Sequence, residues 1–339
     1  MSTTDFTAVA RCLSNEYRDL NGTGIETLEE PPSALEFAQL VHVSRPVVIK
    51  GFEFPALHRW TRDYLAEKMG DSPISVAVTP NGRGDPSLAD SITLGSDGLR
   101  YFVEPFVEKM TMNQLLWRLG SGRIDTGEIH YLQSQNGNLF SSGSLKDGSS
   151  EFGSLVPDVP REIPWCSEAL GLQPDAVNIW IGDERSITSI HSDPYENIYT
   201  VVQGEKHFFL LPPSDSWCLE ERLYPHATYE RQCTSTALEL VPSQEDVPPV
   251  RWSSILDPEA PNVLPKGVTP IRVTLHPGET LYLPVGWWHY VRQSDWTIAL
   301  NWWYDPEMRG MPWVLLNFLR NSKRILSGND EVPPYGLNK

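Results

Sequence analysis

The segment IRVTLHPGETLYLPVGWWHYVRQ, residues 271–293, contains three short apolar runs separated by turn residues. The runs 271–275, 280–283 and 290–293 are rich in β-branched and aromatic residues, which favours strands. His-Pro-Gly follows the first run and Pro-Val-Gly follows the second, and both tripeptides are typical of tight turns. The segment therefore predicts a core built of short strands rather than of helices.

The same pattern of strands and turns extends over much of the sequence. Further strands are expected at 46–50, 75–79, 128–134, 176–181, 186–191, 198–203, 206–211 and 297–304. With 29 Pro and 24 Gly residues, the chain has the many turns that a sandwich or barrel requires. We interpret the polar and Pro-rich residues 212–270 as a long insertion between barrel strands. The Gly- and Ser-rich residues 136–153 are expected to form a mobile loop.

Helices are expected around this β region, at 7–17, 33–43, 60–69, 111–118 and 311–326. Ser33 and Glu36 have the spacing of a capping box at the start of the second helix. The sequence thus predicts an N-terminal region of helices and strands over 1–125. It predicts a β-domain over 126–305, and a C-terminal helix and tail over 306–339.

Acidic residues outnumber basic residues, 44 against 27, which gives the 339-residue chain a formal net charge of −17. A surface of this sign argues against nucleic acid as the main partner, because phosphate binding requires a basic stripe. It suits a basic protein partner, although solubility alone explains the charge equally well. The N-terminus lacks a basic start before an apolar core, and no apolar run reaches about 18 residues, so we expect neither a secretory signal nor a membrane helix. Four scattered cysteines without a CxxC pair indicate a reducing compartment, the cytoplasm or the nucleus.

The sharpest motif is Thr188-Ser-Ile-His191-Ser-Asp193. Side chains two residues apart on a strand point the same way, so His191 and Asp193 can face one metal ion. A distant histidine, His289, follows a Pro-Val-Gly-Trp-Trp turn and can complete the site. Two imidazoles and one carboxylate form a facial triad, which is typical of the catalytic centre of non-haem Fe(II) oxygenases. Because His-x-Asp pairs are common by chance, the residues around the triad must decide.

Further motifs stand in a fixed order around the triad: Asn197, then Gly204-Glu-Lys206, then Pro277-Gly-Glu-Thr-Leu-Tyr-Leu-Pro-Val-Gly-Trp-Trp-His289, then Asn301-Trp-Trp-Tyr304. Together with the His-x-Asp motif they resemble the JmjC (jumonji) oxygenases, with spacing similar to the small hydroxylase-type members. The resemblance covers nearly the whole chain, with local departures in the 136–153 loop and at 243–249. It implies a mostly β fold with flanking helices, around a double-stranded β-helix of the jelly-roll, cupin-like type.

The resemblance also implies the cofactors: Fe(II) held by the triad, 2-oxoglutarate, O2 and ascorbate as a supporting reductant. Lys206 would pair with the far carboxylate of 2-oxoglutarate, because a buried charge without a partner is costly. Tyr131 and Thr188 are the candidate hydroxyl partners of that carboxylate. Asn197 and Asn301 are the candidate amide donors near the metal-bound end of the co-substrate.

The activity that the resemblance implies is protein hydroxylation, with (3S)-lysyl hydroxylation of a developmentally regulated GTP-binding protein of the TRAFAC class as the expected reaction. The alternative is a histone-tail demethylase or an arginine-directed peptidase. The first usually carries chromatin-reading modules, for which this chain has no room, and the second needs a water-activating base that the sequence does not single out. A binding protein without catalysis ranks last, because all three metal ligands are present.

The protein substrate is expected to present a lysine ammonium. Three carboxylates near the metal motif, Asp183, Glu184 and Glu196, are candidate partners for that ammonium. The helices near the two ends of the chain could pair two copies of it, so a homodimer is left open. No membrane or nucleic-acid partner is expected.

Overall fold

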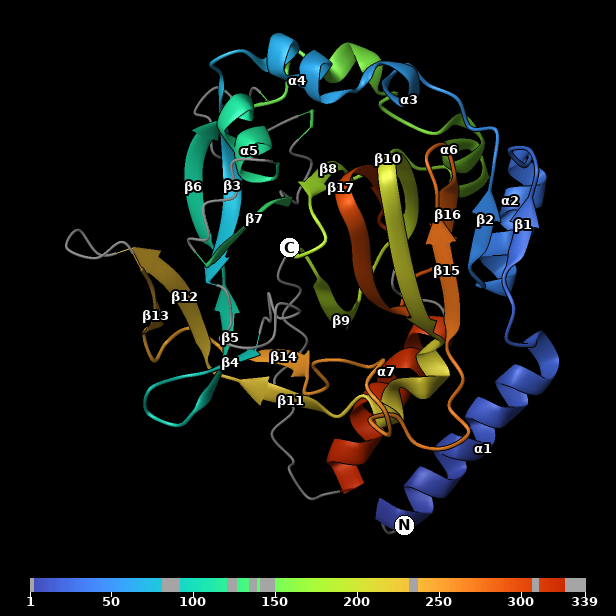
Figure 1. The fold of residues 1–339 in the computed structure, drawn as a ribbon. Helices are drawn as coiled ribbons and strands as arrows, with labels where there is room; N and C mark the ends of the chain where they lie inside the picture. The colour runs from blue at the N-terminus through green and yellow to red at the C-terminus, as the bar shows by residue number, and fades with distance from the viewer. Residues whose placement is uncertain are drawn as a thin grey trace.

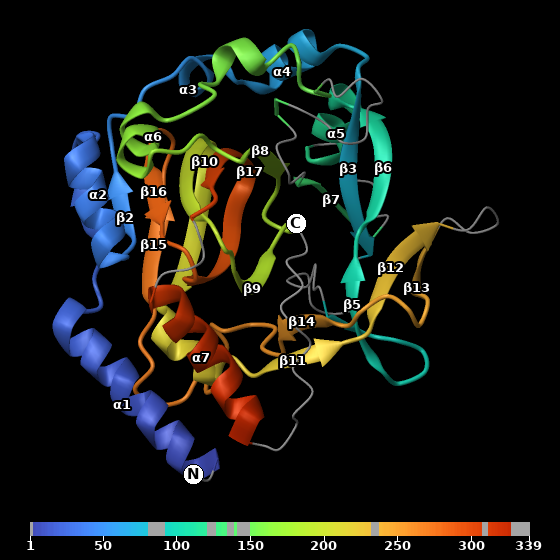
Figure 2. The same cartoon turned by 180° about the vertical axis from the view of Figure 1, so that it is seen from behind.

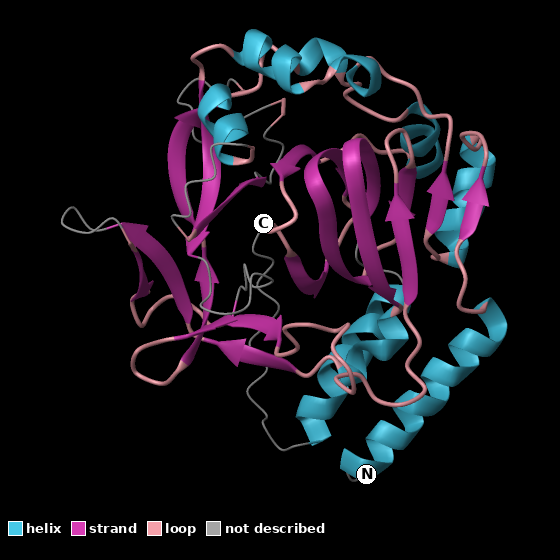
Figure 3. Ribbon diagram, in the orientation of Figure 1, coloured by secondary structure: helices cyan, strands magenta, loops and turns pink. Residues whose placement is uncertain are grey.

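The computed structural model describes residues 3–80, 92–120, 127–133, 139–140, 150–231, 237–306 and 311–326. Strands predominate over helices in these residues, and the helices flank the strands on several sides (Figure 3). The predicted fold class, mostly β with flanking helices, is therefore confirmed. None of the described helices is both long and apolar enough to cross a membrane.

A large sheet occupies the centre of the molecule (Figure 1). Its strands are β1 Glu26–Leu28, β2 Val47–Ile49, β3 Pro73–Pro80, β6 Phe106–Thr111, β7 Glu128–Gln133, β8 Ala176–Gly182, β9 Thr188–Ser192, β10 Glu196–Leu211, β15 Ile271–Leu275, β16 Thr280–Leu283 and β17 Trp288–Tyr304. Neighbours follow the order β1-β2-β16-β10-β17-β8-β7-β3-β6. In addition, β15 pairs with β10 and β9 pairs with β17.

The two longest strands, β10 and β17, each take part in two layers. Residues 197–200 of β10 pair with β16, whereas residues 206–210 pair with β15. In the same way, β17 pairs with β8 over 297–303 and with β9 over 288–291. The two strands therefore run from one layer into the other, which is how a cupin-like double-stranded β-helix is built.

The strands change layer where the register between β10 and β17 shifts, next to Gly204. Gly204 has a φ of +72°, in the left-handed region that favours glycine. A Cβ at this position would lie 2.4 Å from Thr297 Oγ1 and 2.5 Å from the carbonyl oxygen of Trp296. The irregularity keeps the strands paired on both sides of it and gives the bend that the barrel needs.

Side chains on the long strands alternate between two apolar cores. Tyr199 and Ala299 point into the space between the two layers. Ile198, Ile298 and Trp302 point to the opposite face, where they pack beneath the helices. This period of two is expected of strands that are buried on both faces.

The helices are α1 Thr3–Asn21, α2 Ala34–Val43, α3 Ala56–Arg59, α4 Arg62–Met69, α5 Met112–Arg118, α6 Pro164–Leu170 and α7 Met311–Leu326, with a 3-10 turn η1 at Val156–Asp158. The predicted capping box starts α2: Ser33 Oγ accepts a hydrogen bond from the Glu36 backbone N–H, and the Glu36 carboxylate accepts one from the Ser33 N–H. The helices α1 and α7 lie side by side at one end of the barrel, and α3 and α4 lie at the other end (Figures 1 and 2).

The predicted insertion at 212–270 has a structure of its own. It contains the 3-10 helix η2 Pro213–Cys218 and the strands β11 Glu221–Tyr224, β12 His226–Arg231, β13 Leu238–Pro242 and β14 Val250–Ser253. β11 pairs with β14, while β12 and β13 join β5 Arg100–Glu104 and β4 Ile92–Leu94 in a small separate sheet. The insertion therefore extends beside the barrel, and its β14 contacts β9.

Most strands are predicted correctly from the sequence, but two long strands are each predicted as two shorter ones. The predicted strands 198–203 and 206–211 are parts of β10, and 290–293 and 297–304 are parts of β17. The strands continue because Gly204 makes a bulge rather than a hairpin turn. The sequence analysis does not predict the strands β1, β4, β5 and β6, the four strands of the insertion, or the helices α3 and α6.

The helix expected at 60–69 begins at Arg62, because the Thr61 hydroxyl caps it by accepting a hydrogen bond from the Tyr64 N–H at 3.2 Å. Most of the predicted loop 136–153 lies outside the described residues.

Replacing Gly204 by Ala should destabilise the protein by about 3 kcal/mol or more, because the new Cβ would collide with backbone across the bulge. Urea unfolding followed by circular dichroism would measure the change. Gly98→Ala is the matched control, since Gly98 has a φ of +82° but open space around it and should lose only about 1–2 kcal/mol. Equal losses in the two variants would show that the close approach at Gly204 is unimportant.

Candidate active site

Three side chains converge at the junction of β9 and β17. His191 lies on β9, directly opposite His289 on β17, and Asp193 follows the end of β9. His191 Nε2 is 3.6 Å from one carboxylate oxygen of Asp193, and His289 Nε2 is 3.5 Å from the other. One ligand atom from each residue lies within 4.8 Å of the other two, so the three can hold one metal ion.

Both imidazoles are oriented by their own backbone. The Nδ1 of His191 lies 2.8 Å from the Ser189 carbonyl oxygen, and the Nδ1 of His289 lies 3.0 Å from that of Trp287. Because a carbonyl only accepts, each Nδ1 carries a proton, and each Nε2 is turned toward Asp193 and the space between the three residues. The donors fit Fe(II) in a facial triad, since two neutral imidazoles and a carboxylate leave positions open.

The environment keeps the Asp193 carboxylate ionised. Burial alone would raise its pKa, but the two histidines hold the pKa well below its usual range. The turn before β17 is also tied to this segment, because the Gly286 N–H donates to the Asp193 carbonyl oxygen at 3.0 Å. The carboxylate is therefore charged, and the backbone that carries it is tied to the turn before β17.

A buried lysine lies deeper in the barrel. Lys206 on β10 is 2% exposed, and its Nζ donates to the Tyr131 hydroxyl at 3.2 Å and to Oε1 of Gln293. No carboxylate among the described residues forms an ion pair with it. Burial lowers the pKa of Lys206 to about 7. A buried ammonium without a counter-ion makes a favourable site for an external carboxylate.

The other predicted site residues lie around this pocket. Burial raises the pKa of Tyr131, and a hydrogen bond with Thr188 opposes the rise. Asn301 Nδ2 donates to Asn197 Oδ1 at 3.0 Å, and Asn301 Oδ1 accepts from Trp180 Nε1 at 2.8 Å. The structure thus brings all eight predicted residues into one region of the barrel, and the individual co-substrate contacts stay predictions.

Comparison with known proteins agrees with this geometry. A model of the cupin-like domain family matches residues 32–310. The chain is 38% identical over 287 residues to the human bifunctional peptidase and (3S)-lysyl hydroxylase JMJD7, covering 83% of this chain and 84% of that protein. It is 36% identical over 329 residues to lysine-specific demethylase JMJ32 of Arabidopsis thaliana, covering 91% and 90%. It is 30% identical to JmjC domain-containing protein E of Dictyostelium discoideum, covering 88% and 89%.

The chain belongs to the JmjC family of 2-oxoglutarate oxygenases. In this JmjC barrel, each predicted ligand histidine donates to the carbonyl oxygen two residues earlier in the chain. For His191 that carbonyl belongs to Ser189 on β9, and for His289 it belongs to Trp287, in the turn before β17. The site is therefore built largely from local backbone geometry at β9 and β17.

Trp252 is a neighbour of the JmjC metal site that the sequence did not indicate. It lies on β14 of the insertion, and its ring stacks on His191 with centroids 5.6 Å apart and planes 10° apart. Its Nε1 donates to Ser189 Oγ at 3.2 Å. The insertion therefore supports one face of a predicted metal ligand. The sequence of residues 212–270 does not predict the contact between Trp252 and His191, because the contact depends on where β14 lies relative to β9.

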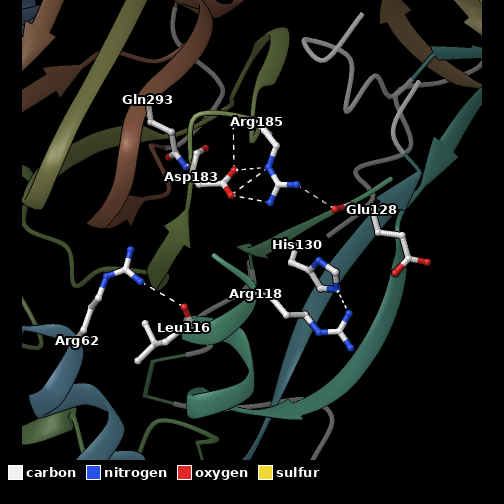
Figure 4. A network of polar contacts seen from close by, with 8 residues as sticks. All are labelled: Arg62, Leu116, Arg118, Glu128, His130, Asp183, Arg185 and Gln293. Carbon is white, nitrogen blue, oxygen red and sulfur yellow. Dashed lines mark hydrogen bonds and ion pairs between the residues drawn. The ribbon is translucent and has the colours of Figure 1, made fainter. Parts of the chain in front are cut away.

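The carboxylates suggested as partners for a substrate lysine have other roles in this JmjC chain. Asp183 is fully buried and receives hydrogen bonds from Arg185, as Figure 4 shows. Glu196 is buried on the outer side of β10, where the Tyr282 hydroxyl donates to it at 2.8 Å. Burial raises the pKa of Glu196 to about 7. The suggestion is therefore wrong for Asp183 and Glu196, whereas Glu184 is exposed.

The tryptophans near the motifs are mainly packing residues. Trp302 contacts Phe52 and Phe54 in the outer core, and Trp287 packs edge-on against Tyr17. Trp303 differs, because it lies on the inner face of β17, next to Asn197 in the register of β10. It is the tryptophan of this group that adjoins the predicted co-substrate pocket.

Asp193→Ala should weaken Mn(II) or Fe(II) binding by at least about 100-fold, because it removes the charged ligand and leaves two neutral imidazoles. Equilibrium dialysis under anaerobic conditions would measure the dissociation constant. The control Asp246→Ala removes an exposed carboxylate of the insertion and should leave the metal dissociation constant unchanged. If Asp193→Ala bound metal with unchanged affinity, the three residues could not be the metal site.

The affinity for 2-oxoglutarate should fall as the pH rises from 7 to 9. Burial places the pKa of Lys206 near 7, so the free pocket loses its ammonium above that pH, and anion binding must then recover a proton. The dissociation constant, measured by calorimetry, should rise up to about tenfold per pH unit. Lys206→Arg stays charged and should give a flat profile. A flat profile in the unaltered protein would contradict this account of the pocket.

Proposed function

We propose that the protein is an Fe(II)- and 2-oxoglutarate-dependent protein hydroxylase that adds oxygen to a lysine side chain. The observation that carries the proposal is the His191–Asp193–His289 triad beside the buried Lys206, which lacks a carboxylate partner among the described residues. The first feature suits Fe(II) and the second suits the distal carboxylate of a dicarboxylic co-substrate.

The residues of the chain divide the work of catalysis. Bound Fe(II) and 2-oxoglutarate supply the oxidising chemistry of the family. The backbone-oriented histidines and Asp193 fix the metal position, and Lys206 with Tyr131 fixes the far end of the co-substrate. Such positioning, rather than proton transfer, is the main contribution of the protein when a cofactor carries the chemistry.

A cationic substrate side chain is supported by the surroundings of the metal site. Tyr195 stacks on Trp303 with centroids 4.8 Å apart and planes 2° apart. Burial raises the pKa of Tyr195, and the nearby carboxylates of Asp175 and Asp305 raise it further. Asp175 is also held beside Trp303, because its N–H donates to the Trp303 carbonyl oxygen at 2.8 Å. Aromatic faces and carboxylates together attract an ammonium group.

The similarity to human JMJD7, whose name includes (3S)-lysyl hydroxylase, supports lysine hydroxylation at C3. The resemblance of the sequence motifs implies the further proposal that the substrate is a developmentally regulated GTP-binding protein of the TRAFAC class. The net charge of −17 suits a basic segment around the target lysine.

Lysine demethylation is the second candidate, because a relative at 36% identity is named a lysine-specific demethylase. Both reactions require the same metal triad and differ in the carbon that is oxidised. The arginine-directed peptidase has less support. Glu196 has a pKa near neutrality but faces Tyr282 on the outer side of β10, away from the triad.

Mass spectrometry of a lysine peptide incubated with the Fe(II)-loaded protein and 2-oxoglutarate distinguishes these activities. The expected product carries one added oxygen atom on lysine and forms with equimolar succinate. A methylated-lysine peptide that loses its methyl group would favour the demethylase, and cleavage without 2-oxoglutarate would favour the peptidase. Turnover of 2-oxoglutarate with no change in any lysine peptide tested would reject lysine as the target. His191→Ala is the inactive control.

A further inference from the structure

Gln293 lies at the centre of the polar contacts behind the predicted co-substrate pocket. It stands directly opposite Lys206 in the register of β10 and β17, and its side chain is almost fully buried. Its Oε1 accepts a hydrogen bond from Lys206 Nζ, and its Nε2 donates to the Asp183 carbonyl oxygen at 2.7 Å. The amide therefore joins the lysine to the end of β8.

The orientation of the Gln293 amide is determined by its partners. A backbone carbonyl oxygen can only accept, so the NH2 group must face Asp183. The carbonyl oxygen of the amide is then left to face Lys206. The ammonium consequently has a strong acceptor that carries no charge of its own.

The group that holds Gln293 is itself fixed. The Asp183 carboxylate accepts from Arg185 Nη2 at 2.7 Å and from the Arg185 backbone N–H at 3.0 Å. Arg185 Nη1 reaches the carbonyl oxygen of Glu128, the first residue of β7 (Figure 4). The strand β7 also carries Tyr131, the other partner of Lys206. The contacts thus form a closed ring that includes Lys206 and is completed by the backbone of β7 between Glu128 and Tyr131.

The Gln293 amide is closely packed against Gly182. A Cβ on Gly182 would lie 2.6 Å from Gln293 Nε2, 2.7 Å from a ring carbon of Tyr131 and 2.8 Å from Ser186 Oγ. No larger residue fits at 182 without displacing Gln293 or Tyr131. The amide therefore has little freedom to turn away from Lys206.

We propose that Gln293 is a positioning residue for Lys206, which holds the ammonium in place through a neutral acceptor and so leaves its charge for the carboxylate of the co-substrate. This inference rests on the proposed 2-oxoglutarate-dependent function. A glutamate at the same position would make the same contact but would neutralise the lysine with an internal ion pair. The choice of an amide over an acid at 293 is thus what keeps the pocket selective for an external anion.

The decisive variant is Gln293→Glu, compared with Gln244→Glu, which adds the same charge at an exposed position of the insertion. We expect the KM for 2-oxoglutarate to rise at least about tenfold in Gln293→Glu. The kcat at saturating 2-oxoglutarate and the Mn(II) affinity without 2-oxoglutarate should stay within about twofold. The pH above which binding weakens should move upward, because the new carboxylate stabilises the ammonium. Gln244→Glu should match the unaltered protein.

A second variant keeps the test informative if Gln293→Glu does not fold. Gln293→Met removes the acceptor without adding charge, so the pH above which 2-oxoglutarate binding weakens should move downward. A merely structural role would not shift this profile. An unchanged KM and pH profile in either folded variant would overturn the inference. If the unaltered protein itself binds no 2-oxoglutarate in calorimetry, the proposed function fails instead.

Discussion

The antiparallel register between β10 and β17 is the constraint on which the rest of the site depends. It places Lys206 opposite Gln293, and Asn197 opposite Trp303, with the bulge at Gly204 between the two pairs. Because side chains alternate along a strand, a slip of one residue would turn the lysine out of the space between the layers and into the outer apolar core. The pairing of β17 with β9 then sets His289 against His191. The two pairings of β17 therefore locate both the metal end and the anion end of the pocket.

Charge inside the barrel is distributed so that one cation keeps its capacity to bind. Asp183 is satisfied by Arg185, and Glu196 is held by the Tyr282 hydroxyl on the other side of the strand. Asp193 faces the two histidines. Lys206 is the cation of this group, and its acceptors in the described structure, Tyr131 and Gln293, are neutral. A buried cation held by neutral acceptors can thus offer a strong and specific attraction to a small dianion.

Much of this arrangement can be predicted from the sequence, because it is encoded locally. The His191-x-Asp193 spacing, the Pro/Gly turn before His289 and the β-rich runs are readable without a structure, and the family pattern adds Lys206. The continuity of β10 could not be predicted, since Gly204 looks like a hairpin turn until its close approach to Thr297 is known. Gln293 and Trp252 could not be found either. Their importance comes from which strand lies opposite or folds back, and residue order alone does not contain that information.

The stacking of Trp252 on His191 connects the predicted metal ligands to the helix α7. The strand pair β11–β14, which carries Trp252, is joined to α7 by two contacts: Arg251 donates to Asn321 at 3.1 Å, and Arg320 pairs with Glu221. Arg320 also covers the ring of Trp288, the residue before His289. The helix α7 is thus connected to His191 through Trp252 and to the neighbour of His289 through Arg320. A substitution that loosens α7 would therefore remove support both from the strand pair that stacks on His191 and from the ring beside His289.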